Sequence, residues 1–309
     1  MAEYLVTGAA GFIGAALAKK LLAAGHGVVT IDNLTTGGEK NVPDGCILIR
    51  GDCQDRETLG KLGNRRFDAI FHIAGQSSGE ISFDDPVYDL QSNAQSTVML
   101  MKYALGTGCG KFLYASSMSV YGEQGDRALD ENTPCVPKSL YAVGKLASEH
   151  YMRIYSGFGL ETTALRLFNV YGPGQNMANL RQGMLSIYLA QALEKKKVVV
   201  KGSLERFRDF VYIDDVAKAF LACLETPGGE SRVFNVGTSE KTTVGGLLAL
   251  MAEKLPFSFE TEVAGSTPGD TFGCRADIGL IAARTGWRPE TSLARGMEEM
   301  IRWALNRRE

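Results

Sequence analysis

The sequence lacks the features that mark secreted, membrane-spanning or nucleic-acid-binding proteins. Its six cysteines contain no CxxC pair, which argues against a zinc site and favours reduced thiols in a cytoplasmic protein. No apolar run approaches the roughly 18 residues needed to cross a bilayer. The 33 basic and 35 acidic residues leave a formal net charge of −2, so no charge excess points to nucleic acid or a membrane as partner. We also expect no metal site.

Glycine is the abundant residue, at 36 of 309 without a collagen-like period, which predicts many turns and close backbone approaches. Short apolar segments alternate with helical patterns in the first half of the chain. Strands are expected at 4–7, 28–31, 47–50, 69–73, 111–116 and 162–168. Helices are expected at 12–24, 87–105 and 139–158. This α/β alternation predicts a Rossmann-type, doubly wound parallel sheet with helices on both faces.

The regular alternation stops near residue 168, beyond which loops lengthen. We therefore expect a first domain over 1–168 and a smaller C-terminal α/β substrate lobe over 169–309. Two further apolar segments, 210–213 and 233–236, look like buried strands, so the stretch 210–236 is expected to return to the first domain.

A glycine-rich turn separates the first predicted strand from the first predicted helix. Its residues are Gly8, Ala9, Ala10, Gly11, Phe12, Ile13 and Gly14. Missing side chains let backbone approach a pyrophosphate at the helix N-terminus, although such a turn can also bind nothing. Asp32 ends the second predicted strand, where a carboxylate can accept both ribose hydroxyls of NAD and would repel the 2′-phosphate of NADP. We therefore predict that residues 1–168 bind NAD.

A second signal combines Tyr141 and Lys145 with Ser117. Tyr141 and Lys145 are four residues apart on a predicted helix and share a face, where an ammonium group would favour the phenolate. Ser117 follows the strand 111–116, at the sheet edge where α/β proteins bind ligands. Its hydroxyl could relay a proton towards Tyr141. A solvated Tyr–Lys pair and a serine that caps a loop are the alternative interpretations.

Together these features resemble one family, the extended short-chain dehydrogenase/reductases, and within it the nucleotide-sugar 4-epimerases such as UDP-glucose/UDP-galactose 4-epimerases. The resemblance runs through nearly the whole chain, in the segments TGAAGFIG, IDNLTTG, GDCQD, FHIAGQ, SSMSVYG, YAVGK, RLFNVYGPGQ, RDFVYIDDVAKAF, FNVGTS and PGD. It implies NAD as cofactor, a UDP-sugar as substrate and a homodimer formed through the helices near 87–105 and 139–158.

The resemblance also implies roles for individual residues. The catalytic set would be Ser117, Tyr141 and Lys145. Beyond the glycine-rich turn, the cofactor would contact Asp32, Asn33, Asp52, Cys53, Ala74, Gly75, Gln76, Asn93, Tyr141 and Lys145. The substrate would contact Ser117, Met118, Ser119, Asn169, Arg208, Asp270 and Cys274. Of these, Asn169 and Arg208 would bind the diphosphate, for which a planar guanidinium is well suited.

The implied reaction is epimerisation at C4. Tyr141 would remove the C4 hydroxyl proton while hydride passes to NAD, and the 4-keto sugar would then accept hydride on its other face. Met118 and Ser119 stand where related dehydratases have Asp-Glu, which argues against dehydration. An NAD-linked keto-sugar nucleotide reductase or dehydrogenase, and a non-catalytic dinucleotide-binding regulator, are the alternative functions.

Two departures from the family pattern bear on the substrate. Thr267 stands where an arginine commonly clamps the diphosphate, and Arg275 and Arg181 are the candidate substitutes. Cys274 stands where epimerases restricted to non-acetylated sugars have tyrosine. The smaller side chain would leave room for an N-acetyl group, unless Phe272 fills the gap.

Overall fold

A computed structural model describes residues 1–228, 231–266, 269 and 271–307. Its centre is a seven-stranded sheet with the order β12-β7-β5-β4-β1-β2-β3, in which every neighbouring pair is parallel. The strands are β1 (Glu3–Thr7), β2 (Gly27–Asp32), β3 (Cys46–Arg50), β4 (Ala69–His72), β5 (Lys111–Ser117), β7 (Glu161–Leu167) and β12 (Arg232–Val236). The predicted Rossmann-type sheet is therefore confirmed.

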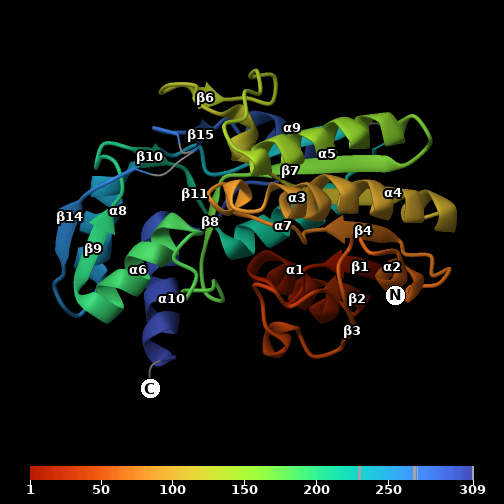
Figure 1. The fold of residues 1–309 in the computed structure, drawn as a ribbon, viewed down its shortest axis with the longest axis horizontal. Coiled ribbons are helices and arrows are strands. Elements are labelled where there is room, and N and C mark those ends of the chain that lie inside the picture. The colour runs from red at the N-terminus through yellow and green to blue at the C-terminus, as the bar shows by residue number, and fades with distance from the viewer. Residues whose placement is uncertain (229–230, 267–268, 270, 308–309) are drawn as a thin grey trace.

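Helices cover both faces of this sheet (Figure 1). One layer contains α1 (Phe12–Ala23) and α7 (Ile213–Glu225), which pack against each other. The other contains α3 (Pro86–Leu90), α4 (Ser96–Thr107) and α5 (Leu140–Ser156). The strands supply side chains to both cores: Val28 belongs to the core beneath α1 and α7, whereas its neighbour Val29 packs with Leu100 of α4. Burial on both faces explains why these strands read as continuous apolar runs.

The helix expected over 87–105 is interrupted. The chain forms α3, then a π-helical turn at Gln91–Gln95, then α4. The wide turn is held by side chains, because the Ser96 hydroxyl donates to the Ser92 carbonyl (2.6 Å) and the Thr97 hydroxyl to the Asn93 carbonyl (2.7 Å). Asn93 also donates from Nδ2 to the carbonyl of Gln76, 3.1 Å away. The interruption of the helix therefore directs the buried side-chain amide of Asn93 towards the loop after β4.

The second lobe has a core of its own, which includes Leu189, Val198, Met251 and Met300. Its elements are α6 (Met184–Lys195), β9 (Lys197–Val200), β10 (Phe207–Arg208), β13 (Thr242–Thr243), α8 (Val244–Lys254), β14 (Glu260–Val263) and α10 (Leu293–Asn306). Short strand pairs connect it to the sheet: β8 (Asn169–Tyr171) with β11 (Phe210–Tyr212), and β6 (Ala128–Leu129) with β15 (Arg275–Ala276). The remaining short helices are α2 (Arg56–Gly60) and α9 (Gly279–Thr285).

The two segments expected to return to the first domain behave differently. Strand β12 pairs along its whole length with β7 and forms the edge of the large sheet. Strand β11 instead pairs with β8, outside that sheet. The reason is local: the backbone N–H and the side-chain amide of Asn169 both donate to the carbonyl of Asp209, at 2.9 and 3.3 Å, which holds the start of β11 against β8.

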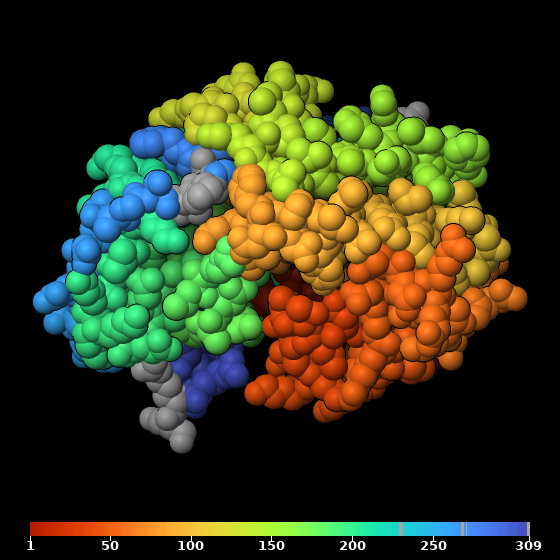
Figure 2. Space-filling model, viewed as in Figure 1, coloured from red at the N-terminus to blue at the C-terminus, as the bar shows by residue number. Residues whose placement is uncertain are grey.

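The lobes meet along a hollow, seen in Figure 2 between the red N-terminal segment, the orange segment after β4 and the green segment that precedes α6. All six cysteines are free thiols. Within the residues that the structure describes, no helix is both long and apolar enough to cross a membrane, and no three His, Cys, Asp or Glu side chains gather as a metal site.

Candidate active site

The glycine-rich turn has space for backbone only. Gly8 has φ of +79°, and a Cβ added there would lie 2.9 Å from the backbone nitrogen of Ala74. A Cβ on Gly14 would lie 2.2 Å from the carbonyl oxygen of Gly8. Helix α1 begins directly after Gly11, and no side chain caps its N-terminus. The turn therefore leaves helix N–H groups and a positive dipole end available to an anion such as a pyrophosphate.

Asp32 lies beside this turn, at the end of β2. Its carboxylate accepts hydrogen bonds from the backbone N–H of Ala10 (2.9 Å) and of Leu34 (2.8 Å), so its orientation is fixed. Asn33 donates to Asp52 over 2.7 Å, which joins the ends of neighbouring parallel segments. Cys53 is buried, and burial raises the pKa of its thiol to about 12. The thiol therefore stays protonated and is not a nucleophile.

The loop after β4 carries the remaining residues expected at the cofactor. The Thr7 hydroxyl accepts from the backbone N–H groups of Ile73 and Ala74, both at 3.0 Å. A Cβ on Gly75 would lie 2.5 Å from Oδ1 of Asn93, a buried oxygen without a hydrogen-bond partner in this structure. With the glycine-rich turn and Asp32, this loop forms a cradle in which glycines and one buried amide face a dinucleotide, so the residues present fit NAD.

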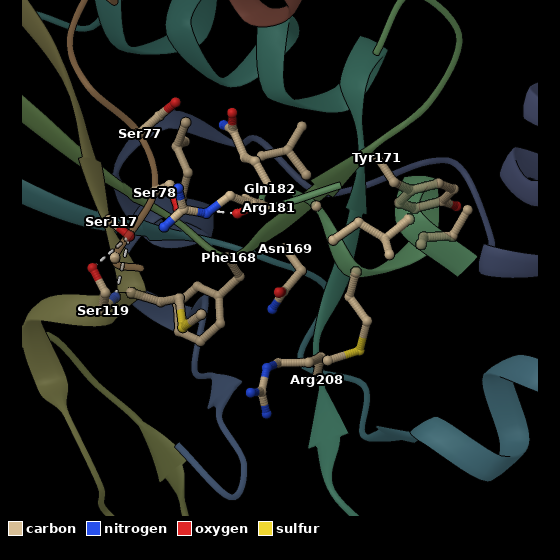
Figure 3. Close-up of a pocket in the computed structure, with 18 of the residues that line it drawn as sticks. Ser77, Ser78, Ser117, Ser119, Phe168, Asn169, Tyr171, Arg181, Gln182 and Arg208 are labelled. Carbon is tan, nitrogen blue, oxygen red and sulfur yellow. Dashed lines mark hydrogen bonds between the residues drawn. The ribbon is translucent and has the colours of Figure 1, made fainter. Parts of the chain in front are cut away.

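Ser117, Tyr141 and Lys145 all line one cavity of about 420 Å³ between the lobes. Ser117 ends β5. Ser139 caps α5 by accepting from the N–H of Ala142, which places Tyr141 in the first helical turn. The hydroxyl of Ser117 accepts from the hydroxyl of Ser119 over 2.9 Å (Figure 3), and Tyr141 lines the same cavity.

The ammonium group of Lys145 lies deeper than these hydroxyls. It donates to the carbonyl of Ala115 over 2.9 Å and sits 5.6 Å from the centre of the Tyr141 ring. Lys145 and Tyr141 therefore share a helix face, as their spacing predicts.

Burial has the largest effect on the pKa values of Tyr141 and Lys145. It raises the pKa of Tyr141 to about 12, opposed by the hydroxyl of Ser117 and reinforced by the negative charge of Asp89. It lowers the pKa of Lys145 to about 8, opposed by Asp89 and Glu149. The expected lowering of the Tyr141 pKa by Lys145 is therefore not achieved by the protein alone, because desolvation of the phenolate outweighs a charge 5.6 Å from the ring.

A buried ion pair attaches helix α5 to the sheet. Glu149 lies two turns after Tyr141 and bonds Arg166 of β7 through both guanidinium Nε (3.0 Å) and Nη2 (2.7 Å). It also accepts from the hydroxyl of Ser116, the neighbour of Ser117. Motif reasoning did not identify this pair. The spacing in the sequence could have revealed it, because Glu149 follows Lys145 by four residues. It therefore lies on the same face of the helix as Tyr141 and Lys145.

The residues expected at the substrate divide into three groups. Met118, Ser119, Asn169 and Arg208 line the cavity, and Figure 3 places Asn169 and Arg208 together on one side of it. Cys274 does not line it: its sulfur lies 3.0 Å from that of Met118, and Met118 is the one of the two that faces the cavity. Asp270, like Thr267, lies outside the described residues.

The structure also locates the candidate phosphate-binding arginines. Arg208 is almost fully buried and donates to the carbonyls of Thr271 (2.9 Å) and Phe272 (3.2 Å). Arg181 lines the cavity, whereas Arg275 does not.

Phe272 is 51% exposed and packs on Phe207 instead of filling the space beside Cys274. Ser78 and Arg206 also line the cavity, and neither belongs to a motif quoted from the sequence.

Comparisons with known proteins agree with this geometry. The model of the NAD dependent epimerase/dehydratase family matches residues 4–237. A UDP-glucose 4-epimerase of Mycolicibacterium smegmatis is 34% identical over 310 residues, covering 98% of both chains. The structure of a UDP-glucose 4-epimerase of Thermotoga maritima with UDP-glucose has a TM-score of 0.95 at 31% identity, covering 99% of this chain and 100% of that one.

Other solved relatives carry NAD or different sugars. A Thermus thermophilus UDP-glucose 4-epimerase in complex with NAD has a TM-score of 0.90 at 33% identity, covering 97% of this chain and 98% of that one. A UDP-glucuronic acid 4-epimerase of Bacillus cereus is 29% identical with a TM-score of 0.90, covering 98% and 99%. A UDP-N-acetylglucosamine 4-epimerase of Methanobrevibacter ruminantium is 27% identical with a TM-score of 0.93, covering 99% of both chains.

The fold, the site and these comparisons together define an NAD-dependent enzyme. The chain belongs to the NAD-dependent epimerase/dehydratase family, which confirms the resemblance seen in the sequence and NAD as its cofactor.

Proposed function

We propose that this protein is a UDP-sugar 4-epimerase that interconverts UDP-glucose and UDP-galactose through a 4-keto sugar. The observation that carries the proposal is the convergence of Ser117, Tyr141 and Lys145 on one cavity next to the dinucleotide cradle. The similarity to UDP-glucose 4-epimerases over nearly the whole chain supports the same reaction.

The chain's own residues supply the proton chemistry. Ser117 orients the C4 oxygen of the sugar and relays its proton to Tyr141, which lines the same cavity. Lys145, held by the carbonyl of Ala115, keeps a positive charge near the Tyr141 phenolate, the form that has to be present before Tyr141 can accept this proton. Bound NAD⁺ supplies the hydride acceptor and a second positive charge. Because the same cofactor returns the hydride, it need not leave the site between turnovers.

The cavity supports epimerisation over dehydration. Removal of a C5 proton and expulsion of the C6 oxygen need an acid and a base beyond the catalytic hydroxyl. Met118 cannot exchange protons, and the Ser119 hydroxyl is bonded to Ser117. Among the described residues, the acid that lines the cavity is Glu80, which is paired with Arg181 over 3.3 Å.

The proposal extends to UDP-N-acetylhexosamines. Cys274 is small, and the side chain in front of it is Met118, an unbranched thioether with three rotatable bonds. A methionine can turn aside for an N-acetyl group more readily than a tyrosine ring, so the wall at this position is adaptable.

Proton NMR tests the proposal directly. The purified protein is mixed separately with UDP-glucose, UDP-N-acetylglucosamine and UDP-glucuronate. A galacto-configured anomeric signal from the first two sugars is the expected result. An exocyclic methyl signal would mean dehydration and overturn the assignment, and absence of change with all three sugars would favour the keto-sugar reductase or dehydrogenase.

Two measurements distinguish the alternative functions. NAD that stays bound through desalting favours the epimerase, whereas cofactor that is lost and must be added for each turnover favours the reductase. The variant Tyr141→Phe removes the base and should reduce kcat by about 10²- to 10⁴-fold with NAD still bound. Unchanged biological activity of this variant would favour the non-catalytic regulator.

We also propose a cytoplasmic homodimer. Free cysteines suit a reducing compartment. Exposed apolar side chains on α3 and α5 support an interface formed by the helices expected from the resemblance. They include Val87, Leu90, Val143 and Ile154, and Phe158 follows directly after the end of α5.

A further inference from the structure

The cavity contains more positive charge than the reaction centre uses. Besides Lys145, it is lined by Arg181, Lys201, Arg206 and Arg208. A nucleoside diphosphate carries its charge on two neighbouring phosphates, and guanidinium groups bind such oxygens in pairs of parallel hydrogen bonds. Arg208 is one expected partner. The residue that acts with it has to be found among the other cations.

The two substitutes considered from the sequence are poorly placed. Arg275 does not line the cavity. Arg181 does, but its guanidinium is paired with two acids, Glu80 at 3.3 Å and Asp84 at 2.7 Å, and 40% of its side chain is exposed. Its position bridges two loops at the rim, where water screens its charge.

Arg206 is placed by the same strand as Arg208. The carbonyl of Arg206 accepts from the N–H of Val244 over 2.7 Å, so the pairing of β10 with β13 continues through this residue. Side chains two residues apart on a strand point the same way. Arg206 and Arg208 accordingly both line the cavity, while Phe207 between them packs away from it against Phe272.

The Arg206 side chain is also held in place. It is 8% exposed, and its Nη1 donates to the carbonyl of Lys201. Gly202, with φ of +96°, bends around it: an added Cβ would lie 3.0 Å from both Cδ and Nη1 of Arg206. A guanidinium fixed before the ligand arrives loses little rotamer freedom on binding, which makes it an effective anion contact.

We propose that Arg206 is the second diphosphate-binding arginine of this enzyme, acting beside Arg208 in place of the arginine absent at position 267. The assignment rests on the proposed UDP-sugar substrate. Arg206, directly before β10, and Arg208 within it then form one phosphate contact, and Phe207 between them keeps both guanidinium groups on the cavity side.

The test is calorimetric binding of UDP, UMP and uridine to the full-length, NAD-loaded protein. Arg206→Met, which keeps an apolar stem of similar length, should raise the Kd of UDP by about 10- to 100-fold, raise that of UMP less, and leave uridine unchanged. Arg206→Lys should recover part of the loss for UDP, since it restores charge without the planar fork. Arg275→Met is the matched control and should bind all three ligands as the unchanged protein does.

Several results would overturn the assignment. A UDP affinity of Arg206→Met within twofold of the unchanged protein would remove Arg206 from the phosphate site. An equal loss for uridine would mean that Arg206 shapes the cavity wall instead. A selective loss of UDP in Arg181→Met, without one in Arg206→Met, would transfer the role to Arg181. Failure of the unchanged protein to bind UDP would overturn the proposed substrate itself, and this assignment with it. Retained NAD and an unchanged melting temperature establish that each variant is folded.

Discussion

At the scale of single residues, burial of Lys145 affects the stability of the folded protein in a way that depends on pH. This effect can be measured separately from catalysis. Lys145 is 4% exposed, and burial lowers its pKa from 10.5 to about 8. In the unfolded chain the same amine titrates at its ordinary value. Below pH 8 the folded protein must therefore hold a buried ammonium ion, which opposes folding. Between pH 8 and 10.5 the unfolded state binds more protons than the folded state, so this contribution becomes less unfavourable as pH rises.

We expect Lys145→Met to increase the stability of the NAD-free protein at pH 7 by a few kcal/mol at most, because it removes the buried charge but leaves the carbonyl of Ala115 without its donor. The gain should shrink towards pH 10. Thermal unfolding of both proteins at pH 7 and pH 10 measures it. A difference independent of pH would show that the folded-state pKa of Lys145 is not lowered.

Cys274 and Met118 give a second prediction at this scale. Cys274→Tyr places a bulky ring where a small thiol now supports Met118, so the methionine should be pushed into the cavity. We expect activity on UDP-N-acetylglucosamine to fall at least tenfold more than activity on UDP-glucose, a difference worth about 1.4 kcal/mol of transition-state binding. Coupled kinetic assays with both sugars measure this difference. Cys274→Ala is the control, and equal losses on both sugars in Cys274→Tyr would contradict the idea.

At the scale of elements, helix α5 is attached to the sheet by charge as well as by packing. The side chains of Glu149 and Arg166 are 4% and 6% exposed, and the acid also holds Ser116 beside the catalytic serine. Removal of one partner of a buried ion pair leaves an uncompensated charge, whereas replacement of both by apolar groups does not.

Glu149→Met should therefore lower the free energy of unfolding by about 3–5 kcal/mol. The double variant Glu149→Met, Arg166→Met should recover most of that loss, yet epimerase activity should stay reduced in both because Ser116 has lost its acceptor. Urea unfolding and initial rates separate the two effects. If the double variant is as unstable as the single one, repacking has failed and the ion pair is needed for more than charge balance.

How far the elements could be predicted depends on where their stabilising contacts come from. The strands inside the sheet were predictable because they are buried on both faces and read as apolar runs, as Val28 and Val29 illustrate. The interruption of the helix at Gln91–Gln95 was not, since its stabilisation includes a contact from Asn93 to Gln76, a residue far away in the sequence.

The same distinction holds in the site. The positions of Ser117, Tyr141 and Lys145 follow from a strand end and a helical spacing, both local properties of the chain. That Met118 lies in front of Cys274, more than 150 residues away in sequence, is a matter of tertiary packing that no motif encodes. The role proposed for Arg206 likewise depends on the turn at Gly202 that holds its side chain.

At the scale of the whole molecule, the exposed stripe on α5 bears on assembly. Val143 and Ile154 on α5 are 50% and 56% exposed, and Phe158, just beyond the end of α5, is 70% exposed, so the apolar surface here is considerable. Ile154→Asp should convert the proposed dimer to a monomer, because a carboxylate would be buried without a partner at the interface.

Light scattering coupled to size-exclusion chromatography measures the change. Val263→Asp is a matched control, since Val263 is also an apolar residue of about half exposure (49%) but lies on β14 in the other lobe. A dimer that survives Ile154→Asp, or one that Val263→Asp dissociates, would place the interface elsewhere.

The position of β12 at the edge of the sheet has a consequence for the order in which the chain can fold. Strand β7 lies between β5 and β12, yet β12 is reached only after the chain has built β8 to β11 and three-quarters of the molecule has left the ribosome. Until residue 236 is made, β7 is an open sheet edge, available to any other unpaired strand. Synthesis of this enzyme therefore includes an interval in which its nascent cofactor-binding half is vulnerable to misassociation, and the segment that ends this interval is one that contributes nothing to the chemistry.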